Sequence, residues 1–177
     1  MRSKITGRLF ACVLLGVCVW ACAGGNCHAR LGETEKQLVA RYGEAELLDL
    51  PENAWDDKTL TFSVDGPAGG SIGVFAYMLD GVSVSENYIF FNADGSKSVM
   101  EGKVYEAAKA IIQANAEGNT WRGLPGLPPP GIEILWVRSD NRETTAVVWK
   151  NQPNVLEVTR AEAHLRQMQH KTGLKGF

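Results

Sequence analysis

Residues 72–91, IGVFAYMLDGVSVSENYIFF, predict the fold of this 177-residue chain most directly. Two runs rich in apolar, β-branched and aromatic residues, Ile72–Leu79 and Val82–Phe91, are separated only by Asp80-Gly81. Asp-Gly between two such runs is typical of a two-residue β-hairpin turn, because both turn positions need a positive φ. The stretch therefore predicts two antiparallel strands.

More strands are predicted on both sides of this hairpin. Before it, Leu60–Val64 alternates apolar with polar residues, the pattern of a half-buried strand. After it come three runs separated by polar turns: Ile132–Arg138, Thr144–Trp149 and Val155–Val158. Strands joined by short turns usually pair antiparallel, so the sequence predicts an antiparallel sheet.

Three helices are predicted from a pattern shared by their starts. This pattern is the capping box, in which the first and fourth side chains bond backbone N–H groups at a helix start. The three matches are Thr34–Gln37, Ser98–Glu101 and Thr159–Glu162. A glycine suited to ending a helix follows each of them: Gly43, Gly118 and Gly173. We expect the first two helices over about 35–42 and about 101–116.

The order of these elements predicts the fold class. A helix is followed by three strands, twice, and a last helix follows. We therefore predict an α+β fold in which helices pack on one face of an antiparallel sheet. Residues 30–177 are expected to form one domain, and the order further suggests two tandem helix-plus-three-strand units, with halves 30–96 and 97–177.

Residues 1–29 differ from the rest and predict export. They hold all four cysteines, and three basic residues precede an uncharged apolar run, Leu9–Ala23, too short for the roughly 20 residues that span a bilayer. The pattern is typical of a signal peptide, and we expect cleavage after Ala29, with Ala23 as the other small-residue site. A lipoprotein with its lipid on Cys22 is the alternative interpretation. The expected location is the periplasm or the cell exterior.

The remaining 148 residues exclude several classes of chemistry. With the three basic residues of 1–29 removed, 15 basic and 20 acidic residues remain, a net charge of −5. Nucleic acid is not expected as a partner, since its phosphates require clustered positive charge. Residues 30–177 contain no cysteine, which excludes thiol nucleophiles and thiolate metal sites there.

The sequence beyond residue 29 offers no catalytic or metal motif. His164 and His170 are six residues apart on the last predicted helix, so their rings point to different sides. Asp56 and Asp57 are adjacent in a loop and are expected to be solvated. There is no serine nucleophile elbow and no phosphate-binding loop. We predict a protein that is not an enzyme and uses no cofactor or metal.

The segment Trp121–Gly131, WRGLPGLPPPG, is the sequence candidate for partner binding. Its four prolines and three glycines predict an extended loop. Bulky apolar side chains in a loop need cover from the core or from a partner. We expect a partner-binding loop formed by Trp121, Leu124, Leu127 and Pro129.

The start of the patterned sequence resembles a known signature. Gly32-Glu33-Thr34, Leu38 and Tyr42-Gly43-Glu44-Ala45 match G-x-[TS]-x3-[VL]-x3-[LY]-G-x-[PA], which opens the SmpA/OmlA (BamE-like) and β-lactamase-inhibitory-protein-like exported domains. It departs from them at Ala45, where proline is common. The same start is similar to exported proteins of unassigned function that share R-[LI]-G-E-T…R-Y-G. The resemblance implies a helix packed on an antiparallel sheet, and a role in protein binding or envelope scaffolding.

These observations predict an exported, non-catalytic module for protein–protein interaction or cell-envelope structure. Its partner would be a protein of the envelope, and it would touch the membrane only through the signal or a lipid on Cys22. The alternative is a small-ligand binder or a hydrolase with a cleft on the sheet.

Overall fold

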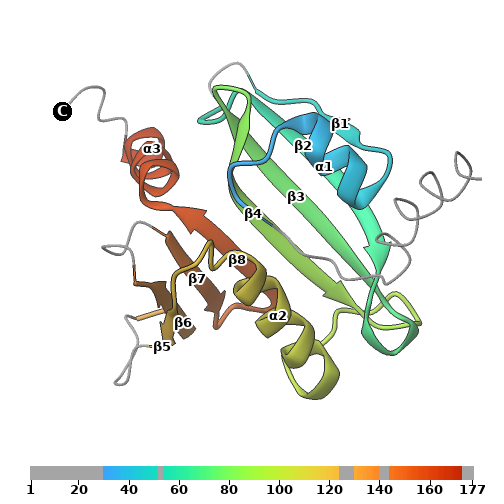
Figure 1. The fold of residues 1–177 in the computed structure, drawn as a ribbon. Helices are drawn as coiled ribbons and strands as arrows, with labels where there is room; N and C mark the ends of the chain where they lie inside the picture. The colour runs from blue at the N-terminus through green and yellow to red at the C-terminus, as the bar shows by residue number, and fades with distance from the viewer. Residues whose placement is uncertain (1–29, 52–53, 124–129, 140–143, 173–177) are drawn as a thin grey trace, which may run out of the picture.

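The computed structural model describes residues 30–51, 54–123, 130–139 and 144–172 (Figure 1). The predicted cleavage after Ala29 and the alternative lipid site at Cys22 lie outside these residues. Within them, helices and an antiparallel sheet make up an α+β fold, which confirms the predicted class. The helices are α1 (Glu35–Tyr42), α2 (Gly102–Ala114) and α3 (Ala161–Thr172).

All the described strands belong to one sheet. They are β1 (Glu46–Leu48), β2 (Lys58–Asp65), β3 (Ser71–Leu79), β4 (Val82–Phe91), β5 (Trp121–Gly123), β6 (Ile132–Arg138), β7 (Thr144–Trp149) and β8 (Gln152–Arg160). Their order across the sheet is β1-β2-β3-β4-β8-β7-β6-β5, and every neighbouring pair is antiparallel. The sheet is thus two four-stranded meanders that meet where β4 pairs with β8.

The hairpin predicted at Asp80-Gly81 forms. Asp80 and Gly81 link β3 to β4 with φ values of 50° and 80°, and Leu79 pairs with Val82 across the turn. The carboxylate of Asp57 accepts the backbone N–H of Asp80 at 2.8 Å. Asp57 is exposed, as expected, and its carboxylate also braces this turn.

Of the three predicted capping boxes, only the first forms. Thr34 and Gln37 cap α1, and Gly43 ends it with a φ of 93°. The N-cap of α2 is Glu101, because the hydroxyl of Ser98 donates to Asn92 Oδ1 instead, at 2.6 Å. Thr159 is still part of β8, where it pairs with Ser85 and Thr145.

Two short strands were not predicted. β1 and β5 have three residues each, too few for an alternating pattern to be recognised. Each of the first two helices therefore precedes four strands, and the expectation of three is wrong.

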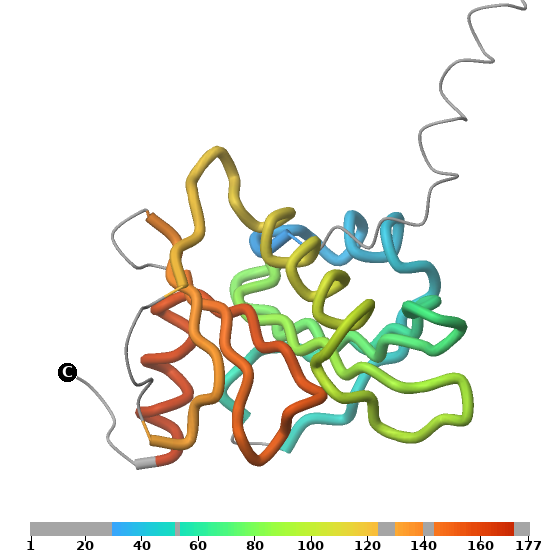
Figure 2. The backbone as a smooth tube through the Cα atoms, turned by 90° about the horizontal axis from the view of Figure 1, so that it is seen from below, coloured from blue at the N-terminus to red at the C-terminus, as the bar shows by residue number. Residues whose placement is uncertain are grey.

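The main core lies between the sheet and the first two helices. Figures 1 and 2 show α1 and α2 on the same side of the sheet. Leu38 and Tyr42 of α1 belong to one buried cluster with Ile111 and Ile112 of α2 and with alternate residues of β2, β3, β4, β7 and β8. α3 packs elsewhere, through Ala163, against a separate cluster at the end of the β3–β4 hairpin.

Gly70 is a position where the fold depends on the missing side chain. A Cβ on Gly70 would lie 2.0 Å from the carbonyl oxygen of Phe91, although the φ of −81° suits any residue. We predict that Gly70→Ala lowers the free energy of unfolding by about 1–3 kcal/mol, as overpacking does. Urea unfolding measures this.

Gly73→Ala is the matched control for that variant. Its Cβ would meet ring atoms of Phe91 and Phe75 at ordinary contact distances of 3.6 and 3.8 Å. We expect little loss of stability. Equal effects of the two substitutions would contradict the close approach at Gly70.

Candidate functional site

The junction of β4 and β8 divides the central side chains between two faces. Ser85–Ile89 pairs with Val155–Thr159, and side chains alternate along both strands. Glu86 and Tyr88 point with their partners toward α1 and α2, where Tyr88 joins the main core cluster. Their neighbours in sequence point to the opposite side of the sheet.

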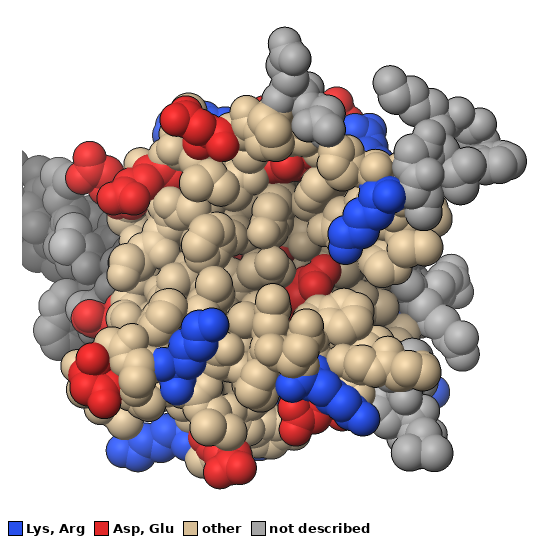
Figure 3. All heavy atoms as spheres, turned by 180° about the vertical axis from the view of Figure 1, so that it is seen from behind, with Lys and Arg blue, Asp and Glu red and all other residues tan. Residues whose placement is uncertain are grey.

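We call that opposite side, over β3, β4, β7 and β8, the open face. The register and the alternation assign its members: Phe75, Tyr77, Asn87, Ile89, Phe91, Thr145, Val147, Trp149, Val155 and Glu157. Most of these side chains are half-buried, although neither α1 nor α2 covers them. Figure 3 views the molecule from behind and shows a broad uncharged surface crossed by a few charged side chains.

The polar groups of the open face lie at its centre. Glu157 pairs in register with Asn87, and its carboxylate accepts the indole N–H of Trp149 at 2.9 Å. The amide nitrogen of Asn87 donates to the hydroxyl of Tyr77 at 3.3 Å. Asn87 Oδ1 is buried and has no hydrogen-bond partner within the described residues. The centre thus presents hydrogen-bond acceptors surrounded by aromatic rings.

Aromatic side chains mark one half of the open face. The ring centroids of Tyr77 and Trp55 are 5.2 Å apart. Phe75 and Phe91 flank Gly73, whose missing side chain leaves room between their rings. The end of the face near the β3–β4 turn is closed by α3, where Ala163 packs with Leu79 and Val84.

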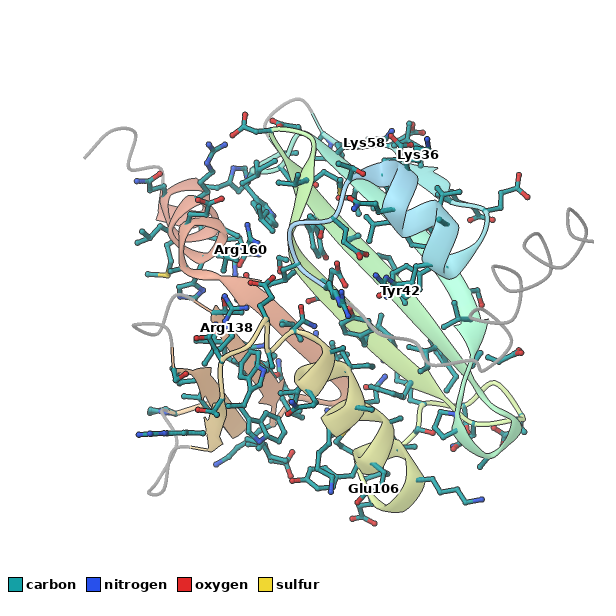
Figure 4. The ribbon with its side chains drawn as sticks, viewed as in Figure 1. Lys36, Tyr42, Lys58, Glu106, Arg138 and Arg160 are labelled. Atoms are coloured by element: carbon teal, nitrogen blue, oxygen red, sulfur yellow. The ribbon has the colours of Figure 1, made fainter. Side chains whose placement is uncertain are left out.

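On the helix side, the same strands hold a buried acid. Glu86 is 0% exposed, and its Oε2 accepts hydrogen bonds from the hydroxyls of Tyr88 and, at 3.4 Å, of Tyr42. Burial raises the pKa of Glu86, and the hydrogen bond from Tyr88 opposes this only in part. Figure 4 labels Tyr42 at the end of α1. The cluster joins α1 to β4, and its closure from solvent makes it a structural group.

A second polar cluster ties the start of the described chain to the end of α2. The guanidinium of Arg138 lies 3.0 Å from the carboxylate of Glu117 and donates to the carbonyl oxygen of Asn115 at 2.9 Å. The backbone N–H of Leu31 donates to Asn115 Oδ1 at 2.8 Å, and Arg160 donates to the Leu31 carbonyl. Figure 4 labels both arginines. Because these groups bond one another, they brace the fold.

The predicted partner-binding loop is corrected at its first residue. Trp121 begins β5, pairs in register with Arg138, and packs half-buried against the main core. It is therefore not an exposed loop residue. Leu124, Leu127 and Pro129 lie outside the described residues, so their predicted role stays a prediction.

The other residues considered as site candidates in the sequence do not form a site among the described residues. His164 and His170 are both exposed on α3. Asp56 is buried and accepts the hydroxyl of Thr59, so its expected solvated role is wrong. Among the described residues, no three His, Cys, Asp or Glu side chains gather as metal ligands. No described helix has the length and apolar character to cross a membrane.

The open face was missed in the sequence, although a signal for it existed. In Ile72–Leu79, residues of both parities are apolar, and only one parity can face the helices. A strand that is apolar on both sides indicates that both faces need cover.

No protein-family model, curated protein or solved structure matches this chain.

The pH dependence of stability tests the assignment of Glu86. A carboxyl whose pKa is raised by folding stabilises the folded state below its unfolded pKa, and this contribution is lost as the pH rises through the folded pKa. From about pH 4 to about pH 8, we therefore expect the free energy of unfolding of the native protein to fall relative to that of Glu86→Gln. Urea unfolding across this range measures the difference.

Tyr88→Phe supplies the companion variant. Loss of its hydroxyl leaves the buried carboxyl with one donor fewer, so we expect a destabilisation of about 1–3 kcal/mol. A difference between native protein and Glu86→Gln that stays constant with pH would contradict the buried acid.

Proposed function

We propose that this protein is an exported, non-catalytic module that binds another protein through the open face of its sheet. The composition of that face carries the proposal. Aromatic and aliphatic side chains dominate it, and Glu157 is its one charged member. The centres of protein interfaces are likewise poor in charge and rich in aromatic residues.

The centre of the open face favours a partner that brings a hydrogen-bond donor. Glu157 and Asn87 Oδ1 are both acceptors, and Asn87 Oδ1 lacks a partner within the described residues. A cationic side chain of the partner would pair with the half-buried Glu157 carboxylate and would lie beside Trp149. We therefore propose a folded protein partner that places an arginine or lysine at this point.

A non-catalytic role is supported by the buried polar groups outside the open face, because they are bonded to other groups of the fold. Glu86 is bonded to tyrosines and sealed, and Arg138 is bonded to Glu117 and to a backbone carbonyl. A catalytic site needs polar groups that converge in an open pocket. One hollow of about 570 Å³ lies beside the end of α2 and is lined by Arg30, Gln113, Glu117 and small residues.

We also propose that the chain is built from two tandem units, 30–96 and 97–177. The repeated order of elements supports this, since α1 precedes β1 to β4 and α2 precedes β5 to β8. In each unit the helix would pack on the same face. Joined at β4 and β8, two such units would leave one long face that neither α1 nor α2 covers, which is the surface that the proposed function uses.

Export is part of the proposal, and intact mass tests it. After cleavage at Ala29 the exported protein would begin at Arg30 and contain no cysteine. We expect the mass of residues 30–177 for protein recovered from the envelope or the medium of the native cell. A mass with lipid on a terminal Cys22 would support the lipoprotein, and the mass of the full chain would contradict cleavage.

Affinity capture from the native envelope tests the binding surface. We use Ile89→Arg and Thr145→Arg as altered baits, because both place charge and bulk on the open face. Each should weaken capture of the partner about tenfold or more, as changes at the centre of an interface do.

Val39→Arg is the matched control, since Val39 is 39% exposed on α1. It should capture the partner as the native protein does, and circular dichroism should show all three variants folded. If Ile89→Arg and Thr145→Arg are both folded and still capture the partner, the open face is not the binding surface.

A further inference from the structure

β1 is the edge strand at one side of the sheet. It pairs with β2 through Glu46↔Thr61, Leu47↔Leu60 and Leu48↔Thr59, and no described strand lies on its other side. The free N–H and C=O groups of an edge strand are a template for another strand. Natural edges are commonly protected by short length, charged side chains, proline or a bulge. β1 is short and carries Glu46, but it has no lysine, proline or bulge, so a partner with basic side chains is not repelled.

Two leucines on this edge are unusually exposed. Leu47 is 62% exposed and Leu48 is 46% exposed. Successive residues of a strand point to opposite faces, so each face of the sheet ends at one of these leucines. Leu47 pairs with Leu60, which is 1% exposed in the core. A ninth strand beside β1 would extend the apolar layer and cover both leucines.

The charges around β1 are mostly negative. Glu44, Glu46 and Asp49 are exposed, and none has an ion-pair partner within the described residues. Lys58 on the neighbouring strand is already paired, since its Nζ lies 2.8 Å from both carboxylate oxygens of Glu35. A second copy of this chain would bring like charges together at the edge, which is unfavourable. A basic partner is favoured instead.

A hollow of about 310 Å³ lies beside the strand and narrows the choice of partner. It is lined by Leu47, Leu48, Asp49, Leu50, Asp57 and Lys58. Leucine walls fit the methylene stem of a lysine or arginine, and carboxylates at the rim fit its charged end. Asp57 already accepts the N–H of Asp80, so Asp49 is the carboxylate that would meet the incoming cation.

We propose that β1 is a second docking edge, which takes an extended segment of another protein with alternating apolar and Lys or Arg side chains. The segment joins the sheet as a ninth strand through backbone hydrogen bonds, and the hollow takes one basic side chain. This edge is separate from the open face, which lies over β3, β4, β7 and β8. An experiment that disproves binding at one of these surfaces therefore leaves the proposal for the other surface intact.

An NMR titration of the isotope-labelled protein tests this edge. The probe is an acetylated and amidated hexapeptide of alternating lysine and valine. We expect saturable shifts of the Leu47 and Leu48 amides and slower hydrogen exchange at β1. Glu46→Lys should weaken binding about tenfold, a change typical for loss of a complementary charge and gain of a like one. Glu106→Lys, the same change on the exposed side of α2, should leave binding unchanged, and so should Ile89→Arg.

Two further peptides and one measurement of mass distinguish the proposed basic strand from other occupants of the edge. The same peptide with alternate backbone nitrogens methylated cannot pair as a strand and should not bind. A peptide with glutamate in place of lysine should bind at least about tenfold more weakly. The proposal is overturned by equal binding of either peptide, or by no saturable shift at β1. It is also overturned if ultracentrifugation shows a dimer that Leu47→Ser dissociates, since the occupant would then be a second copy.

Discussion

The pairing of β4 with β8 is the constraint on which the rest of this structure depends. Five residue pairs, from Ser85↔Thr159 to Ile89↔Val155, join strands that lie 66 to 74 residues apart in the chain. Such distant pairing costs loop-closure entropy before it gains any contact. The gain comes from one shared core, in which side chains of both meanders lie buried beneath α1 and α2. Without this pairing, the core would be two smaller layers, each with a free apolar edge.

The same pairing gives two carboxylates opposite roles. Glu86 and Glu157 lie in adjacent positions across the seam but point to opposite faces. α1 seals Glu86, and an ionised carboxylate so deeply buried is costly, a cost that the tyrosine hydroxyls offset only in part. Glu157 stays partly accessible, and among the described residues its carboxylate accepts a side-chain hydrogen bond from the indole N–H of Trp149. The two residues are of the same type, and they differ in role because a helix covers Glu86, which joins α1 to the sheet, but not Glu157, which we assign to binding.

Local patterns predicted the elements well and their assembly poorly. Asp80-Gly81 correctly predicted the central hairpin, and Thr34 with Gly43 correctly predicted the ends of α1. Turns and caps are predictable in this way because their chemistry depends only on nearby residues. Ser98 also had the pattern of a cap, but its hydroxyl donates to Asn92, six residues earlier, and Glu101 is the N-cap instead. The β4–β8 pairing leaves no local pattern, so the open face was indicated only by the apolar residues on both sides of β3. The predicted partner-binding residues were instead Trp121, Leu124, Leu127 and Pro129, of which Trp121 packs half-buried against the core.

We propose that the open face of the sheet is accessible in the isolated protein and covered by a partner in the complex. Hydroxyl-radical footprinting of the free protein and of the captured complex tests it most directly. We predict that Phe75, Ile89 and Trp149 are oxidised in the free protein and protected in the complex, while Val39 on α1 reacts equally in both. Open-face residues that are unreactive in the free protein, or that stay equally reactive in the complex, would contradict the account.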